Sequence, residues 1–300
     1  MARLVYRCYA KINLTLEVLR RREDGYHELA SLVHTIGLAD DLHIVLASEL
    51  LTRAEGLDIE PDTNLVFLAA ELLASATRVR AGAELTLNKR IPAAAGLGGG
   101  SSDAATTLVG LNTLWGTGVH LAELTRLAGE LGSDVPFFVR GGAALMQGRG
   151  EDLEVLPPVQ GQWFVIVVPR HDVLDKTKRL YAALEPTDFS SGELTALAAH
   201  RLRQHLPLIE DHLTNAFSRP ARVIFPGLSS VWTKAEALCG RRFFLSGAGP
   251  ALFALAADRP DARRQAARLA RLGLPTYATR TVKHARASIR LAADSTIGYP

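Results

Sequence analysis

One glycine-rich segment has the composition of a loop that binds phosphate. Between an expected strand and an expected helix stand Pro92, Ala93, Ala94, Ala95, Gly96, Leu97, Gly98, Gly99, Gly100, Ser101 and Ser102. Glycines let the backbone approach a ligand closely and adopt positive φ angles. The first free N–H groups of the helix, with the two serine hydroxyls, can then bind phosphate oxygens. We therefore expect phosphate binding at this loop.

Two common nucleotide-binding loops do not fit this segment. It has no Gly-Lys-Ser/Thr run, so it is not a Walker A loop. Ser101 stands where a dinucleotide-binding loop would have its third glycine. A flexible linker is the remaining alternative. The helical spacing of Leu108, Leu111 and Leu114 directly after the loop argues against it.

Asp134 could serve a phosphoryl transfer. It lies between Gly132-Ser133, where one expected helix ends, and Val135-Pro136, where a short apolar helix is expected to begin. Such a transfer needs a carboxylate that orients or deprotonates the attacking hydroxyl. The alternative is a structural N-cap, which aspartate performs well, and the two roles can coexist.

Lys11 could supply positive charge to the same reaction. Lys11 and Asn13 alternate within an otherwise aliphatic segment, so on a strand they share a face. A lysine there could stabilise the charge that develops on the transferred phosphoryl group and on the attacking oxygen. The alternative is an edge strand with a solvated polar face.

Two further segments have weaker patterns. Asp24–Glu28 predicts a turn that enters a strand, and its Tyr26-His27 pair could stack on a base and hydrogen-bond it. Ser246–Pro250 predicts a tight turn, for which a plain hairpin is an alternative.

The elements that must position these residues mix strands and helices. Strand patterns cover 5–19, 42–46, 83–87, 163–168, 243–245, 251–255 and 277–282. Helical spacing covers 65–73, 120–131, 175–184, 191–204, 229–238 and 261–272, and follows the glycine-rich loop as far as Gly116. A short linker is expected at 157–162. We predict an α+β fold with two domains, residues 1–158 and 159–300.

Composition narrows the class of protein. The 34 basic and 31 acidic residues leave a net charge of only +3, which is no argument for a nucleic-acid partner. No signal peptide or membrane-length apolar run is visible, and Cys8 and Cys239 have no metal-like spacing. The Arg-rich segment 261–272 favours a solvated helix face over a site for an anionic partner. We expect a cytoplasmic protein that binds a small molecule and neither nucleic acid nor a membrane.

Together these segments resemble the GHMP kinases, named for galactose, homoserine, mevalonate and phosphomevalonate. Gly96–Ser102 is similar to that family's ATP loop, and Ser246–Pro250 to its C-terminal glycine motif. The similarity is greatest to a member that phosphorylates a cytidyl substrate in the non-mevalonate route to isopentenyl diphosphate. The motifs that carry it, in matching order and spacing, are Ala10–Leu14, Asp24–Glu28, Asp62–Leu65, Gly96–Ala105 and Gly132–Pro136.

The resemblance implies an N-terminal domain like ribosomal protein S5 domain 2 and a ferredoxin-like C-terminal domain. It implies ATP with Mg²⁺, and direct transfer to the tertiary 2-hydroxyl of the cytidyl substrate. Lys11 and Asp134 would be the catalytic pair. Residues 92–102 would hold the ATP phosphates, with Asn64 and Lys89 near the nucleotide. The residues implied to bind the cytidyl substrate are Asn13, Tyr26, His27, Thr177 and Tyr181.

The sequence departs from the family pattern at three places. Tyr9 stands where Pro is usual, Ala93 stands where Met is common, and His171–Lys178 is more charged than expected. Another GHMP kinase, acting on homoserine or a mevalonate derivative, is an alternative that the Tyr26-His27 pair disfavours. A non-catalytic RNA-binding module is a second, which Lys11 and Asp134 disfavour. The sequence leaves open a monomer or a homodimer, assigns no metal ligands, and gives no role to the tail after Arg286.

Overall fold

The computed structural model describes residues 3–55, 64–159, 161–171 and 173–289 of the chain. Its larger sheet has nine strands, with the order β13-β1-β3-β2-β9 and with β4 to β7 joined to it through β3. The strands are β1 (Arg3–Asn13), β2 (Thr15–Arg21), β3 (His27–Ala47), β4 (Leu50–Glu55), β5 (Gly82–Asn88), β6 (Ala143–Gly148), β7 (Asp152–Leu156), β9 (Thr214–Asn215) and β13 (Arg286–Ile289).

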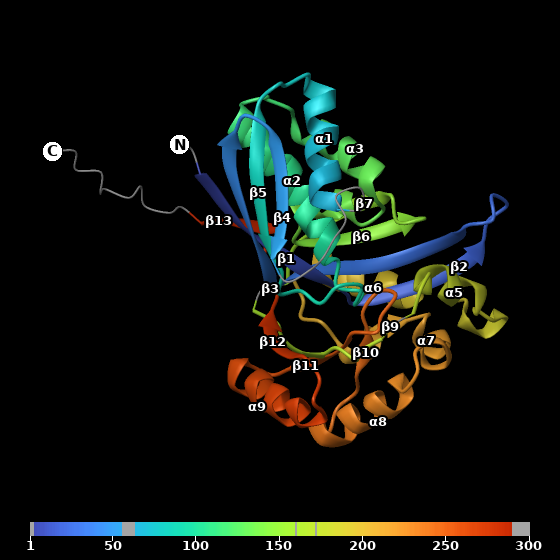
Figure 1. Ribbon diagram of the computed structural model, residues 1–300. Helices are drawn as coiled ribbons and strands as arrows, with labels where there is room; N and C mark the ends of the chain where they lie inside the picture. The colour runs from blue at the N-terminus through green and yellow to red at the C-terminus, as the bar shows by residue number, and fades with distance from the viewer. Residues whose placement is uncertain (1–2, 56–63, 160, 172, 290–300) are drawn as a thin grey trace.

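The 21-residue strand β3 is the centre of this sheet. It pairs with β1, β2, β5 and β6, and Figure 1 shows it curving across the molecule. Strand β1 lies between β3 and β13 along Val5–Cys8, and its later residues pair with β3. Lys11 and Asn13 are both buried on it. The solvated polar face that the edge-strand alternative expects is therefore wrong, because both side chains are buried.

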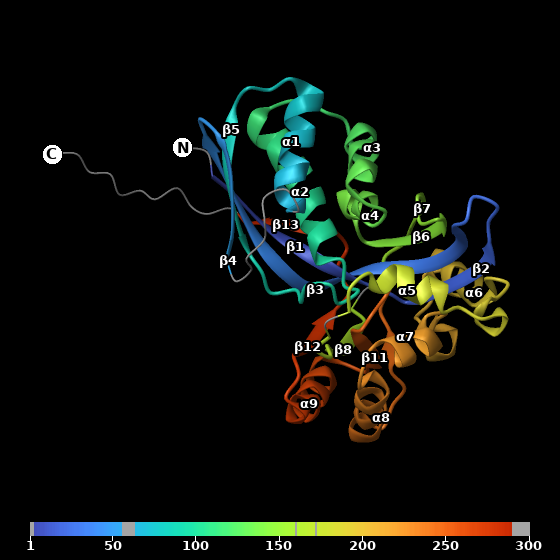
Figure 2. The same ribbon diagram turned by 45° about the vertical axis from the view of Figure 1, so that its right-hand side comes forward.

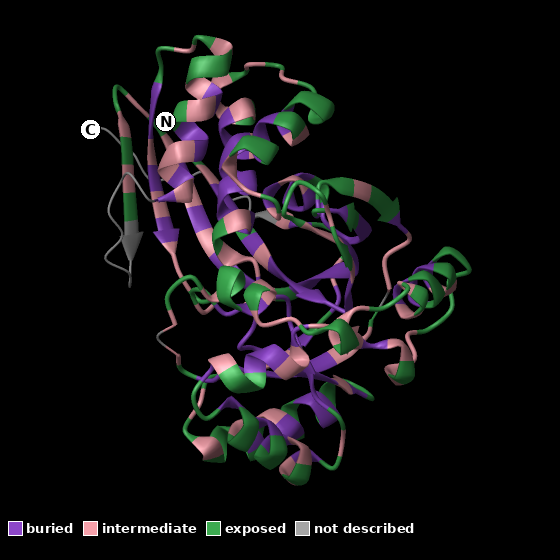
Figure 3. Ribbon diagram, turned by 90° about the vertical axis from the view of Figure 1, so that its right-hand side faces the viewer, coloured by how far each residue is buried: buried purple, intermediate pink, exposed green. Residues whose placement is uncertain are grey.

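Helices α1 (Leu65–Thr77), α2 (Gly99–Trp115), α3 (Leu121–Leu131) and α4 (Val135–Arg140) cover one face of the larger sheet (Figures 1 and 2). Asn64 caps α1, because its Oδ1 accepts from the N–H of Val66 at 3.0 Å. Gly116 ends α2 in a left-handed conformation. Apolar side chains of all four helices pack on the sheet as one core. Figure 3 colours the ribbon by burial, and stretches of buried residues are purple on the strands and on parts of the helices.

A second, four-stranded sheet has the order β10-β11-β8-β12. Its strands are β8 (Trp163–Val167), β10 (Phe244–Leu245), β11 (Leu252–Ala256) and β12 (Thr276–Arg280). The later helices are α5 (Lys176–Ala182), α6 (Glu193–Arg203), α7 (Ser218–Ile224), α8 (Leu228–Cys239) and α9 (Arg259–Leu269), with short 3₁₀ turns at Pro186–Asp188, Glu210–His212 and Ala270–Leu272. Helix α9 packs on this sheet beside α8, whereas α6 packs on β2 and β3.

The predicted α+β class is confirmed. The division at residue 158 stays a prediction, and two late strands, β9 and β13, pair with strands of the first half. The sequence patterns did not predict β4, β6, β7 or α7. Residues 286–289 of the tail form β13, and 290–300 lie outside the described residues, as do Asp62 and Thr63.

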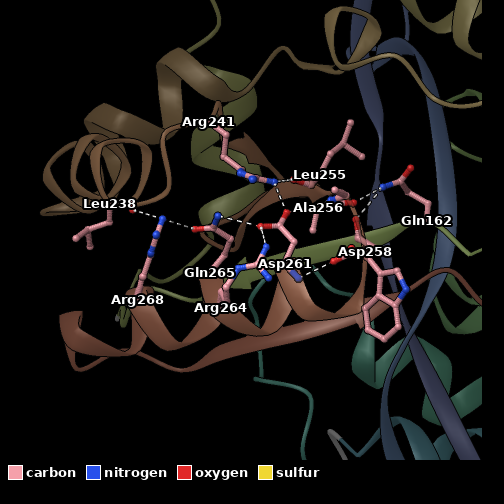
Figure 4. Close-up of polar contacts among 12 residues, drawn as sticks. Gln162, Leu238, Arg241, Leu255, Ala256, Asp258, Asp261, Arg264, Gln265 and Arg268 are labelled. Carbon is pink, nitrogen blue, oxygen red and sulfur yellow. Dashed lines mark hydrogen bonds and ion pairs between the residues drawn. The ribbon is translucent and has the colours of Figure 1, made fainter.

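Several polar side chains of the Arg-rich helix α9 bond to one another or to neighbouring elements (Figure 4). Asp261 accepts from Gln265 at 3.2 Å and forms an ion pair with Arg241 at 3.1 Å. Arg241 also donates to the carbonyl of Leu255, on β11, at 2.5 Å. Arg268 donates to the carbonyl of Leu238, on α8, at 3.4 Å. These contacts fasten α9 to its neighbours and favour a structural role for the segment.

Candidate active site

Two cavities meet at the first turn of α2. The larger has a volume of about 1320 Å³ and is lined by β1, β2 and β3, the turn before α4, and α5. The smaller, of about 470 Å³, is lined by the glycine-rich loop together with Asn64 and Lys89. Ser101 lines both cavities. A ligand in one cavity can therefore reach a ligand in the other beside Ser101.

The glycine-rich loop is packed so closely that two of its glycines leave no room for a side chain. Gly96 and Gly98 have φ angles of 83° and 70°. A Cβ on Gly96 would lie 2.1 Å from the carbonyl oxygen of Ser246, and one on Gly98 would lie 2.8 Å from the ring of Phe138. Gly98 gives α2 no side-chain cap, so the first N–H groups of α2 stay available to an anion.

Lys11 and Asp134 face one another in the larger cavity. Lys11 Nζ lies 3.3 Å from Asp134 Oδ2 and donates to Asn13 Oδ1 at 2.5 Å. The Lys11 side chain is 5% exposed, whereas that of Asp134 is 39% exposed. Asp134 occupies the N-cap position of α4, yet its side chain makes no capping hydrogen bond. Its carboxylate is therefore directed to Lys11 and the cavity rather than to the helix.

A short chain of hydrogen bonds fixes Asn13 beside Lys11. Asn13 Nδ2 donates to Ser31 Oγ at 2.8 Å, and Ser31 Oγ donates to the carbonyl of Thr15 at 2.6 Å. The backbone N–H of Lys11 donates to the carbonyl of Leu97 at 2.9 Å. The catalytic candidate and the glycine-rich loop are thus held to each other directly.

Lys89 is held by two buried carboxylates. Its Nζ lies 2.5 Å from Asp40 Oδ2 and 2.7 Å from Asp103 Oδ2. Burial opposes the charge of Lys89, but the two carboxylates outweigh it and raise its pKa. Burial also raises the pKa of Asp103, and the nearby Lys89 partly offsets that effect. Asp40 Oδ1 further accepts from the N–H of Ile91 at 2.8 Å, which anchors the start of the loop.

Aromatic side chains gather in the lining of the larger cavity. The rings of His27 and Tyr181 are stacked, with centroids 4.8 Å apart, and Phe217 meets Tyr181 edge-on at 4.9 Å. Burial and the charge of Arg21 lower the pKa of His27, which favours its neutral form. Burial and the charge of Asp134 raise the pKa of Tyr181 to about 12. Tyr26 is exposed and lies under the guanidinium of Arg149, at 4.9 Å.

The turn at Ser246–Pro250 closes over this site from the second half of the chain. Ser246 Oγ donates to the carbonyl of Gly96 at 3.0 Å. A Cβ on Gly247 would lie 3.1 Å from Lys11 Nζ. Asn215 Nδ2 supports the turn by donating to the carbonyls of Leu245 and Gly247, both at 2.9 Å. The turn joins the antiparallel strands β10 and β11, as the hairpin alternative expects, and it also lines the larger cavity through Gly247 and Ala248.

Most of the predicted site residues come together. The larger cavity is lined by Lys11, Asn13, Tyr26, His27, Asp134, Thr177 and Tyr181. The smaller cavity is lined by Asn64, Lys89, Pro92–Gly96 and Gly98–Ser101. Leu97 and Ser102 line neither cavity, because their side chains point into the core.

Sequence reasoning missed several residues of the site. Arg149, Asn215 and Phe217 line or support it, and Lys176 contacts the glycine-rich loop. Asn215 could have been found from the sequence, because an amide within a short apolar segment indicates a buried polar group with a specific partner. The other three belong to short turns or helices without a pattern that marks them.

Comparison with known proteins adds independent evidence. Residues 64–142 match the GHMP kinases N terminal domain, and residues 194–273 match the GHMP kinases C terminal domain. A 4-diphosphocytidyl-2-C-methyl-D-erythritol kinase from Dehalococcoides mccartyi is 40% identical over 275 residues, which cover 91% of this chain and 96% of the relative. One from Pelotomaculum thermopropionicum is 42% identical with the same coverage.

Solved structures agree with these relatives. A crystal structure of 4-(cytidine 5'-diphospho)-2C-methyl-D-erythritol kinase is 37% identical and has a TM-score of 0.76. The match covers 92% of this chain and 98% of that one. A homoserine kinase from Cytophaga hutchinsonii, at 16% identity and a TM-score of 0.71, shares the fold over 96% of this chain and 98% of its own. The chain therefore belongs to the GHMP kinases, and within them to the family of the 4-diphosphocytidyl-2-C-methyl-D-erythritol kinases.

Proposed function

We propose that this protein transfers the γ-phosphoryl group of ATP to the tertiary 2-hydroxyl of 4-diphosphocytidyl-2-C-methyl-D-erythritol, a step of the non-mevalonate isoprenoid pathway. One observation carries the proposal for this chain. The larger cavity is lined both by the Lys11–Asp134 pair, which is bonded to the phosphate loop, and by an aromatic cluster. An acceptor that carries both a hydroxyl and a base fits that arrangement.

The reaction needs few groups from the protein. Asp134 accepts the proton of the attacking hydroxyl, since its carboxylate faces the cavity and is not used as a cap. Lys11 stabilises negative charge on the transferred phosphoryl group, and Asn13 holds its ammonium in place. The N–H groups at the start of α2 hold the ATP phosphates. No covalent enzyme intermediate is required, because positioning and electrostatics supply most of the acceleration in phosphoryl transfer.

The aromatic cluster would recognise the cytosine ring. Tyr26 and Tyr181 offer faces on which a base can stack. A neutral His27 has one ring nitrogen that donates and one that accepts, which can pair with part of the cytosine edge. Asn13 and Thr177 line the same cavity and would contact the sugar alcohol or the diphosphate.

Mg²⁺ fits the nucleotide cavity as an ion that arrives with ATP. The residues that the structure describes include no group of three acidic, His or Cys side chains that could form a metal cage. Mg²⁺ in such enzymes is held largely by phosphates and water, with one or two carboxylates. Among the described residues that line this cavity, Asp103 is the acidic one, so we propose it for a contact through water. Bound there, the ion would neutralise phosphate charge.

The test of this function is turnover of ATP with three acceptors: the cytidyl substrate, homoserine and mevalonate. We expect turnover with the cytidyl substrate alone. In the double variant Tyr26→Ala/His27→Ala, loss of stacking and of the paired base edge should raise the KM for the cytidyl substrate by at least about tenfold, with the KM for ATP nearly unchanged. Efficient phosphorylation of homoserine or mevalonate by the wild type would overturn the cytidyl assignment and leave the broader kinase class.

We also propose that the protein works in the cytoplasm, as a monomer or a homodimer. Both cysteines are free and buried, as expected in a reducing compartment. In the described residues, no helix is long and apolar enough to span a bilayer.

A further inference from the structure

Lys176, the first residue of α5, contacts both glycine-containing loops at once. Its ammonium donates to the carbonyl oxygen of Ala94 in the glycine-rich loop, and to that of Gly249 in the turn at Ser246–Pro250. His171 Nε2 also lies 3.2 Å from the carbonyl oxygen of Ala94. The segment that contains Lys176 therefore joins two loops that lie far apart in the sequence.

The backbone around this contact is held in uncommon conformations. Ala94 and Asp175 have φ angles of 51° and 50°, in the left-handed region that residues with a Cβ seldom adopt. Such conformations persist where the surroundings impose them, and they concentrate at functional sites. Asp175 turns the chain so that Lys176 reaches the loop, and the conformation of Ala94 presents its carbonyl to that lysine.

Lys176 differs from the other two lysines of the site in its partners. Lys11 and Lys89 each lie beside a carboxylate. Within the described residues, Lys176 is in no ion pair, and its partners are carbonyl oxygens. Burial and the charge of Lys11 lower its pKa to about 8. Burying a charged ammonium without a carboxylate partner is unfavourable, because the charge loses contact with water. We therefore infer that the contact of Lys176 with the two carbonyls positions a group that the reaction needs.

The peptide plane shows what is positioned. The carbonyl of Ala94 and the N–H of Ala95 belong to one planar trans peptide, so they point in opposite directions. Lys176 holds the carbonyl, and the N–H of Ala95 therefore points away from Lys176. Ala94 and Ala95 line the nucleotide cavity, whereas Lys176 does not. Within the described part of the chain, the N–H of Ala95 has no hydrogen-bond partner.

We propose that Lys176 is a positioning residue for ATP. By holding the carbonyls of Ala94 and Gly249 together, it orients the start of the glycine-rich loop so that the Ala95 N–H can bind a phosphate oxygen. The proposal rests on the ATP-dependent function proposed above. It gives the charged segment His171–Lys178, which departs from the usual family sequence, a specific task.

The test compares Lys176→Met with Lys176→Arg, and with Lys234→Met as a matched control on the exposed surface of α8. Calorimetry with a non-hydrolysable ATP analogue and no acceptor measures the affinity directly. Loss of two charge-assisted hydrogen bonds in Lys176→Met should weaken binding of the analogue by about tenfold or more. The KM for ATP should rise in parallel, while kcat at saturating ATP and the KM for the acceptor change by less than about threefold. Lys176→Arg should restore most of the affinity, and Lys234→Met should match the wild type.

Unchanged affinity for the analogue in a folded Lys176→Met protein would overturn the proposal. If circular dichroism shows that this variant does not fold, the proposal is tested on the wild-type protein instead. The rate at which an amine-reactive reagent labels Lys176 is then measured with and without the ATP analogue. We expect the analogue to slow labelling of Lys176 relative to Lys234, because a bound nucleotide holds the loop against it. Equal labelling with and without the analogue would contradict the proposal. Neither measurement uses the acceptor, so an error in the assigned acceptor would leave both results intact.

Discussion

Two lysines beside the glycine-rich loop, the buried Lys11 and the partly buried Lys89, have opposite surroundings. Lys89 lies 2.5 and 2.7 Å from two carboxylates whose side chains are 0% and 2% exposed. Lys11 lies 3.3 Å from one carboxylate, on Asp134, that is 39% exposed. The first arrangement is closed, and its charges stabilise one another in the protein interior. The second is open on one side, so its charges can still act on a ligand.

The difference shows how to separate a structural ion pair from a reactive one. Both lysines are near the nucleotide loop, and sequence alone gives both a plausible role there. A charge that is fully satisfied by buried partners anchors the chain. A charge with a long contact and an accessible partner is available for chemistry.

The largest expected effect is on the open pair. In Asp134→Asn the amide keeps the shape of the side chain but cannot accept the proton of the hydroxyl. We expect kcat to fall on the order of 10²–10⁴-fold. The thermal midpoint should stay near that of the wild type, because Asp134 makes no capping bond. A steady-state assay with near-normal turnover would remove Asp134 from the mechanism.

The second prediction exchanges each lysine for methionine. Lys89→Met strands two buried carboxylates, so the free energy of unfolding should fall by about 3–5 kcal/mol, reduced to the extent that Asp103 takes up a proton. Lys11→Met leaves behind a partly solvated carboxylate and should cost much less stability, but kcat should fall by about 10²-fold or more. Urea unfolding and steady-state kinetics on both variants measure the two effects. The comparison fails if Lys89→Met loses turnover while it keeps its stability.

The buried His34 extends the comparison, because no carboxylate within the described residues forms an ion pair with it. His34 lies on β3, where Nδ1 is 2.8 Å from the carbonyl of Thr35 and Nε2 accepts from the N–H of Val159 at 2.9 Å. Burial lowers its pKa from 6.5 to about 4, against a smaller opposite effect of the Thr35 carbonyl.

Since the folded state disfavours the proton on His34, its contribution to stability is full above pH 6.5 and is lost as the pH falls toward 4. Between pH 7 and pH 5 the free energy of unfolding should drop by about 2 kcal/mol from this group. Urea unfolding at several pH values measures the drop. His34→Gln can keep both hydrogen bonds but cannot titrate, so its stability should depend less on pH over that range. Equal slopes in the two proteins would show that His34 is not the group that titrates.

The first half of the site could be predicted because each of its residues lies in a short local pattern. A few neighbouring residues are enough to predict the local structure around each of them. This holds for the glycine-rich loop, for Lys11 with Asn13 on a strand, and for Asp134 after a helix end. The fold class followed for the same reason, since most helices and several strands have clear periodicity.

The remainder depends on contacts between segments that are distant in the sequence. The sequence could place Lys89 near the nucleotide, but it could not predict the ion pair with Asp40. That ion pair depends on the pairing of β3 with β5, two strands that are distant in the sequence. Lys176 lies in a segment whose charges carry no periodic signal, and its target carbonyls are on two other loops. Short strands such as β6 and β7 are specified by their partners more than by their own composition, because β propensity depends on context.

Strand β3 has a consequence for how the family can vary. This one strand, whose pairing with β1 is irregular between Ile36 and Ala39, carries His27 in the lining of the larger cavity and Asp40 beside Lys89 at the start of the glycine-rich loop. The separation of acceptor and donor is therefore set by a count of residues along a single backbone. Inserting one residue within the regularly paired stretch Leu29–His34 would invert the side chains that follow it, as far as the irregular pairing between Ile36 and Ala39. Length changes that preserve activity should accordingly fall in the turns that precede and follow β3, and the strand itself acts as a molecular ruler between the two substrates.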